Sequence, residues 1–130
     1  MRRFMRFFFH HFYHALAWTY DFVAAVVSLG RWKRWGRAAL PHLRGKRVLE
    51  IGFGPGHLLA ALHRSGFLAV GMDESPQMIR QARRNLARSK LSAAILRGYA
   101  QFLPFPADSF DSVVSTFPSE YIADPRTLAE

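Results

Sequence analysis

The sequence predicts an α/β fold with a parallel, doubly wound sheet, and three observations support this prediction. Short apolar segments alternate with segments in which apolar residues recur at helical spacing. Residues typical of helix ends separate them: Ser75 precedes one helical segment that starts with Pro76, and Gly66 follows another. Glycines and polar residues follow the apolar segments, as they do at the carboxyl ends of parallel strands. Alternating strands and helices require right-handed crossovers.

The expected elements begin at residue 46. Strands are predicted at residues 46–51, 67–72, 93–97 and 111–116. Helices are predicted at residues 57–65, 76–89 and 124–130. Ser75 is the expected N-cap of the second helix, and Asp124 that of the third, because each precedes a proline in the first helical position.

Charge divides the chain into two parts. Residues 1–47 contain ten Lys or Arg and one acidic residue, Asp21, whereas residues 48–130 contain eight of each sign. We therefore expect a basic, aromatic helical segment at residues 1–45 and an α/β domain at residues 46–130. The chain has no cysteine, which excludes disulfides, thiolate zinc sites and cysteine nucleophiles.

The basic segment suits peripheral contact with an anionic membrane through residues 1–37. Trp32 and Trp35 lie among cationic residues, as in membrane-interface segments. The alternative is that the segment covers the domain core and its basic residues lie in water. Charge confined to one segment favours lipid over nucleic acid as the partner, so we expect a cytoplasmic protein, peripheral at the membrane. His10 and His14 lack a nearby carboxylate, and no metal site is predicted.

The stretch VLEIGFGPGHLLAAL, residues 48–62, places Gly52, Gly54 and Gly56 between a strand and a helix. Such a turn is very tight or allows a ligand close to the backbone. A dinucleotide-binding G-x-G-x-x-G motif would need glycine where His57 stands. Asp73 ends the next strand, where a carboxylate can accept both hydroxyls of a ribose. Capping of the following helix is the alternative role of Asp73.

Three segments, VLEIGFGPGHLL, GMDESPQMI and GYAQFLPFPADSFDSVVSTF, resemble the class I S-adenosylmethionine-dependent methyltransferases. Within that class they are similar to the group (type 11) that contains the ubiquinone/menaquinone biosynthesis C-methyltransferases. The resemblance runs from Val48 to Phe117 in the family's order and spacing. It implies a Rossmann-like sheet of seven strands, of which this chain supplies strands one to four, and hence a C-terminally truncated chain. It also implies S-adenosyl-L-methionine as cofactor.

The same resemblance implies roles for individual residues. Glu50 would stabilise the glycine turn near the methionyl amino group, and the glycines would let the backbone approach the methionine and ribose. Asp73 would hold the ribose diol. Met78, with Met72, would pack on the adenine, although core packing of the helix explains Met78 equally well. The complete predicted cofactor-binding set is Glu50, Gly52, Phe53, Gly54, Gly56, Asp73, Glu74, Met78, Tyr99, Ala100, Gln101 and Ser115.

One departure from the family concerns adenine. Relatives commonly have an acidic residue after the third strand, where this chain has Tyr99 after Gly98. Adenine recognition would then depend on the backbone of Tyr99 or Ala100, or on Gln101. No catalytic base is assigned, because His57 is expected as the first residue of a helix.

The expected reaction is methyl transfer to a small, lipophilic acceptor at carbon or oxygen. Residues 116–119 read Thr-Phe-Pro-Ser, where enzymes that methylate nucleobase or glutamine nitrogens often have Asp/Asn-Pro-Pro-Tyr, and cytosine C5 methylation needs a cysteine. Two alternatives remain open. The chain is a catalytically incomplete cofactor-binding fragment, or it is a membrane- or RNA-associated basic module.

Overall fold

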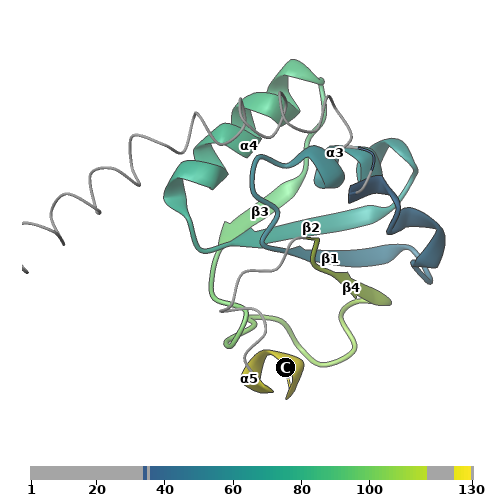
Figure 1. Ribbon diagram of the computed structural model, residues 1–130, viewed down its shortest axis with the longest axis vertical. Coiled ribbons are helices and arrows are strands. Elements are labelled where there is room, and N and C mark those ends of the chain that lie inside the picture. The colour runs from purple at the N-terminus through teal and green to yellow at the C-terminus, as the bar shows by residue number, and fades with distance from the viewer. Residues whose placement is uncertain (1–33, 35, 117–124, 130) are drawn as a thin grey trace, which may run out of the picture. The chain divides into compact units, whose positions relative to one another are not determined.

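The structure, a computed structural model, describes residues 34, 36–116 and 125–129 (Figure 1). The chain divides into two units, residues 1–35 and 36–130, and all described residues except 34 belong to the second. The predictions for residues 1–33, including the histidine pair, the tryptophan at 32 and the first part of the membrane segment, lie outside the described residues. The predicted boundary between residues 45 and 46 stays a prediction.

The domain contains a four-stranded parallel sheet in the order β3-β2-β1-β4. Its strands are β1 (Arg47–Ile51), β2 (Leu68–Asp73), β3 (Ala94–Arg97) and β4 (Ser112–Val114). The central strand β1 pairs with both β2 and β4, so that Leu49 lies opposite Val70 on one side and Val113 on the other. The predicted parallel α/β sheet is confirmed. Strand β4 is shorter than expected, because only three of its residues pair with β1.

Two helices form the crossovers and lie on the same face of the sheet (Figure 1). Helix α3 (His57–Arg64) joins β1 to β2, and α4 (Pro76–Arg88) joins β2 to β3. The Ser75 hydroxyl accepts a hydrogen bond from the Met78 amide at 3.3 Å, which confirms Ser75 as the N-cap. A 3₁₀ turn, η1 (Leu40–His42), precedes the sheet, and α5 (Pro125–Ala129) is the last described element. Among the described residues, no helix is long and apolar enough to span a bilayer.

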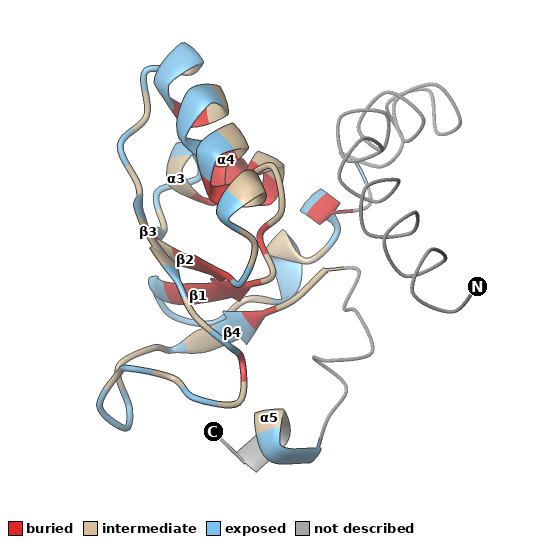
Figure 2. Ribbon diagram, turned by 90° about the vertical axis from the view of Figure 1, so that its left-hand side faces the viewer, coloured by how far each residue is buried: buried red, intermediate tan, exposed pale blue. Residues whose placement is uncertain are grey.

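Buried side chains pack on both faces of the sheet, and Figure 2 shows the buried residues of β1 and β2 in red. Because side chains alternate along β1, Val48 packs among residues of α3 and α4, whereas Leu49 faces the other side. There the connection between β3 and β4 covers the sheet, with Phe105 and Phe110 in edge-to-face contact at 4.9 Å between ring centroids. Each fully buried Val or Leu contributes about 1.5–3 kcal/mol, so this two-sided burial holds β1 at the centre of the fold.

Asp111 connects the start of β4 to the start of β1. Its carboxylate accepts hydrogen bonds from the Lys46 and Arg47 amides, both at 2.9 Å. It also forms an ion pair with the Arg47 guanidinium at 2.7 Å. These contacts hold the pKa of Asp111 well below its usual range, the side-chain bond to Arg47 being the largest cause. A Cβ at Gly45 would overlap the Asp111 side chain, so the close approach depends on glycine there.

Candidate functional site

The strand order fixes where a ligand can bind. The chain moves outward from β1 to β2 and β3, and then returns to the opposite side of β1 as β4. In open parallel sheets the crevice at such a reversal, at the carboxyl ends of the strands, is the binding site. The turn after β1 and Ser115 after β4 lie at this reversal. The fold thus brings together the glycine turn and Ser115, which were predicted as site residues from separate parts of the sequence.

The glycine turn has the backbone that the sequence predicts. Gly52, Gly54 and Gly56 have φ angles of 68°, 54° and 80°, a region that favours glycine. The Gly52 amide donates to the Met72 carbonyl at 2.8 Å, which ties the turn to β2. A Cβ at Gly54 would meet no atom within 4 Å, so the space beside this residue is open.

Gly56 has a packing role that the sequence did not predict. A Cβ there would lie 3.0 Å from the Cβ of Ala82 in α4. The missing side chain therefore allows the close packing of the turn against α4. The side chain of Asn85, one helical turn after Ala82, donates to the Pro55 carbonyl at 2.9 Å. Asn85 was not among the predicted residues, although a polar residue on the buried side of an amphipathic helix is a usable signal.

Asp73 connects the two loops that follow β1 and β2. One carboxylate oxygen accepts from the Gly54 amide and the other from the Ser75 amide, both at 2.9 Å. The residue is 8% exposed. Each carboxylate oxygen can accept more than one hydrogen bond, so ribose hydroxyls can still bind here. Asp73 therefore organises the glycine turn and the N-cap residue Ser75, beyond either role considered from the sequence.

Glu50 is the most unusual group in the site. It lies on β1 just before the glycine turn, is 1% exposed, and its Oε2 atom is buried without a hydrogen-bond partner. Burial, and secondarily the charge of Asp73, raise its pKa to about 8. An unpaired carboxyl group in a protein interior is costly. A cationic ligand group would offset this cost, because it would supply both an opposite charge and a hydrogen-bond donor.

Two apolar residues of the predicted site have their side chains in the core. Phe53 is 4% exposed and packs with Ile79 and Ala82, so its side chain supports the turn from the core. Met72 is 1% exposed and packs beneath Gly98, where a Cβ would lie 2.7 Å from the Met72 sulfur. Met78 is only partly buried and lies outside the core clusters of the described residues.

The residues after β3 divide by exposure. Tyr99 is 53% exposed, whereas the side chain of Ala100 is buried beside Leu49 and can offer only its backbone to a ligand. Gln101 is partly buried. Glu74 is exposed, and its carbonyl accepts from the Arg97 side chain at 3.0 Å, which joins the loop after β2 to β3. The Ser115 hydroxyl is buried without a partner among the described residues.

The described residues contain no cluster of three or more His, Asp or Glu suited to a metal ion. The site instead combines an open glycine turn, a carboxylate that organises two loops, and a buried carboxyl group with an unused acceptor. This arrangement suits an organic ligand with hydroxyl donors and a positive charge.

Residues 48–130 match the family described as "Methyltransferase domain". The chain belongs to this family. It is 35% identical over 124 residues to a demethylmenaquinone methyltransferase of Symbiobacterium thermophilum. The aligned residues cover 88% of this chain and 49% of the relative. It is 32% identical over 117 residues to the ubiquinone/menaquinone biosynthesis C-methyltransferase UbiE of Geobacter sulfurreducens. That alignment covers 84% of this chain and 46% of the relative. The chain thus spans about half the length of the curated relatives it matches.

Solved structures support the same fold. A SAM-dependent methyltransferase of Aquifex aeolicus superposes with a TM-score of 0.63 at 20% identity, over 73% of this chain and 55% of that chain. The expected class I, Rossmann-like methyltransferase fold of the ubiquinone/menaquinone type is confirmed. S-adenosylmethionine is the cofactor of the family, as the sequence predicted.

Proposed function

We propose that this chain binds S-adenosylmethionine and provides the cofactor site of a methyltransferase that acts on a small, lipophilic acceptor. The observation that supports the proposal is the buried, unpartnered carboxyl oxygen of Glu50 beside the glycine turn. An amino acid ammonium group is the cation that this position suits, because it offers three donors and a full charge.

The described residues also fit the rest of the cofactor. The open space beside Gly54 admits a ligand close to the backbone. Asp73 keeps acceptor capacity for the ribose diol, and the partly exposed Met78 and Tyr99 offer apolar surface for the adenine. The bound cofactor supplies an electrophilic methyl group on a positively charged sulfur. The protein residues contribute orientation, which accounts for much of the rate in such a displacement.

The proposed acceptor is a quinone precursor or a comparable lipophilic ring, methylated at carbon or oxygen. Support comes from the two relatives described above, whose names refer to menaquinone and ubiquinone biosynthesis. An acceptor that holds a proton at the reacting atom must lose it to a base or to water. Purified protein incubated with labelled S-adenosylmethionine and a demethylated quinol, followed by mass spectrometry, tests this assignment.

Cofactor binding is best tested with two ligands that differ only in the methionine portion. Both S-adenosylhomocysteine and 5′-methylthioadenosine carry the adenine and the ribose. Only S-adenosylhomocysteine also carries the ammonium group. Glu50→Gln should weaken binding of the first by about ten- to a hundredfold, since a hydrogen bond to a charged group contributes about 1.5–3 kcal/mol. It should leave binding of the second unchanged. Calorimetry that shows equal losses for both ligands would contradict the role of Glu50.

Asp73→Ala should weaken both ligands by about tenfold or more, because both carry the ribose diol. Thermal unfolding of each variant controls for misfolding, since Asp73 also bonds Gly54 and Ser75. Asp73→Asn, which keeps one carbonyl acceptor, serves as the milder variant. Unchanged affinity in a folded Asp73→Ala protein would exclude ribose binding at this residue.

We also propose that residues 1–37 give the protein peripheral contact with the cytoplasmic face of a membrane. The support is the excess of basic and aromatic residues in this part of the sequence. Deletion of residues 1–11 should reduce sedimentation with liposomes that contain anionic lipid. Undiminished sedimentation of the shortened protein would overturn this proposal.

A further inference from the structure

The neutral charge balance of residues 48–130 conceals a strong separation of charge. Residues 76–97 contain six Lys or Arg and no acidic residue, whereas residues 98–130 contain five acidic residues and one Arg. The basic residues are concentrated on α4. A helix with this composition needs an anionic partner or open solvent on its outer side.

The arrangement of α4 exposes its cations on one side. Ile79, Ala82 and Leu86 recur at helical spacing and are buried against the sheet. The cations are all exposed, and none forms an ion pair with a carboxylate in the described part of the chain. They are Arg80, Arg83, Arg84, Arg88 and, just after the helix, Lys90.

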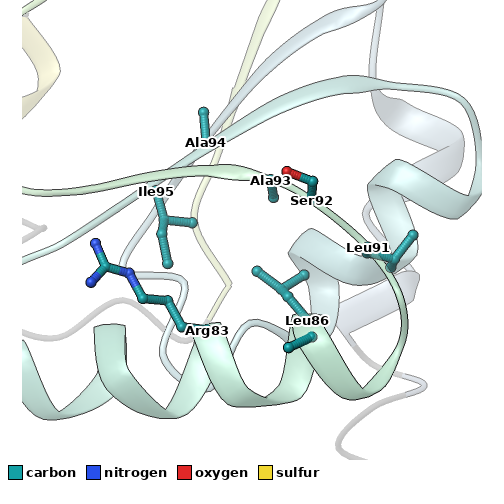
Figure 3. Close-up of a pocket in the computed structure, with 8 residues that line it drawn as sticks. Arg83, Leu86, Leu91, Ser92, Ala93, Ala94 and Ile95 are labelled. Atoms are coloured by element: carbon teal, nitrogen blue, oxygen red, sulfur yellow. The ribbon is translucent and has the colours of Figure 1, made fainter.

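An open pocket of about 370 Å³ is lined by one of these cations, Arg83 (Figure 3). It lies between the second half of α4 and the start of β3, the edge strand of the described sheet. Leu86, Leu91, Ala93 and Ile95 contribute aliphatic side chains to its walls, and polar groups, including Arg83 and Ser92, contribute the larger share of the lining. Figure 3 shows Arg83 reaching from α4 alongside Ile95, so one guanidinium borders the pocket.

The pocket is separate from the proposed cofactor site. Its strand residues lie at the amino end of β3. The glycine turn follows the carboxyl end of β1, and Asp73 is the last residue of β2. In a parallel sheet these are opposite ends. We call the five cations and the pocket together the α4–β3 face.

We propose that the α4–β3 face binds an anionic phospholipid surface. Five unpaired cations attract the headgroups, and the aliphatic side chains that line the open pocket beside Arg83 contact an apolar group of the same lipid. The chain's own segment 1–47 carries nine net positive charges and would be repelled. Residues 76–97 include no aromatic side chain on which nucleic acid bases could stack, so a lipid is favoured over RNA.

The first test measures binding of the full-length chain to vesicles of phosphatidylcholine with or without phosphatidylglycerol. Arg84→Gln/Arg88→Gln should lower the partition coefficient for the anionic vesicles by about twenty-five-fold, from about fivefold for each cation near the surface. The control, Arg44→Gln/Lys46→Gln, removes the same charge from exposed residues before β1 and should have a much smaller effect. Equal losses in the two double variants would overturn the proposal.

The second test locates the contact, independently of any binding by residues 1–37. The chain has no cysteine, so a single Ser92→Cys change places one environment-sensitive fluorophore at the pocket. A matched label at Ser65→Cys lies at the end of α3, outside the pocket. Anionic vesicles should shift the emission of the first label to shorter wavelength and leave the second unchanged. An unshifted Ser92 label, or a shift produced by polyuridylate and not by vesicles, would overturn the assignment to lipid.

Discussion

At the scale of single residues, Glu50 determines how the site responds to pH. Its pKa of about 8 means that the ligand-free protein holds a proton there at neutral pH. Binding of an ammonium group would ionise the carboxyl group and release this proton. We therefore expect the affinity for S-adenosylhomocysteine to rise between about pH 6.5 and about 8. In Glu50→Gln the affinity should not change over this range. Isothermal titration calorimetry at several pH values measures both affinities.

The same residue predicts a pH dependence of folding. The ordinary pKa of 4.5 applies in the unfolded chain and about 8 in the folded one, so between these values the folded state binds more protons. The free energy of unfolding should therefore fall as pH rises through this window, with a slope of up to about 1.4 kcal/mol per pH unit. Urea unfolding at several pH values measures this slope. Glu50→Gln should abolish it, and a slope that persists in the variant would assign it to other groups.

Two neighbouring glycines should respond differently to a methyl group. Gly56→Ala combines a positive φ with a contact to Ala82, and should cost about 2–4 kcal/mol of stability. Gly54→Ala meets open space, so it should cost only about 1 kcal/mol from its φ angle. The Gly54 variant should nevertheless lose more affinity for S-adenosylhomocysteine. Urea unfolding and calorimetry of both variants check this; a reversed order of stabilities would contradict the packing role of Gly56.

The residue roles were only partly predictable. The spacing of Gly52 and Asp73 predicted a tight turn and a carboxylate at neighbouring strand ends, because periodicity locates the ends of strands. The sequence did not show that Phe53 and Met72 turn inward, or that Gly56 packs against Ala82. Those facts depend on which elements meet in space, which local patterns do not contain.

At the scale of elements, periodicity predicted the strands and helices within about one residue, except β4. Strong alternation and clear caps account for this success, as the N-cap Ser75 and the first helical residue Pro76 of α4 illustrate. Strand β4 was predicted too long because DSVVST continues its β-type composition beyond the three residues that pair with β1. Pairing with a neighbour, and not composition, ends that strand.

The Asp111 connection between β1 and β4 gives a prediction at this scale. Its lowered pKa means that it stabilises the fold at neutral pH and loses this effect as pH falls below about 3.8, its usual value. Asp111→Asn should therefore lower the melting temperature at pH 7, and the difference should shrink in acid. Thermal unfolding followed by circular dichroism at several pH values measures this. A difference that is constant with pH would show that the ion pair with Arg47 contributes little.

At the scale of the whole molecule, ligand binding and folding should be linked. A ligand that binds only the folded state at a hundred times its dissociation constant stabilises it by about 2.7 kcal/mol. Saturating S-adenosylhomocysteine should thus raise the melting temperature by several degrees in a domain of this size. Adenine alone lacks the groups that Glu50 and Asp73 are proposed to bind, and should shift it much less. Equal shifts from the two ligands would contradict the proposed site.

The position of β1 in the middle of the sheet has a consequence for synthesis on the ribosome. The strand is made before its neighbours, and β2 can join it soon after emerging from the exit tunnel. Its other edge stays unpaired until β4 appears, because Arg47 and Asp111 are 64 residues apart. Closing so long a loop is entropically costly and slow. The nascent chain therefore exposes an unprotected strand edge for most of the domain's translation, which is the stage when chaperones would be most useful to it.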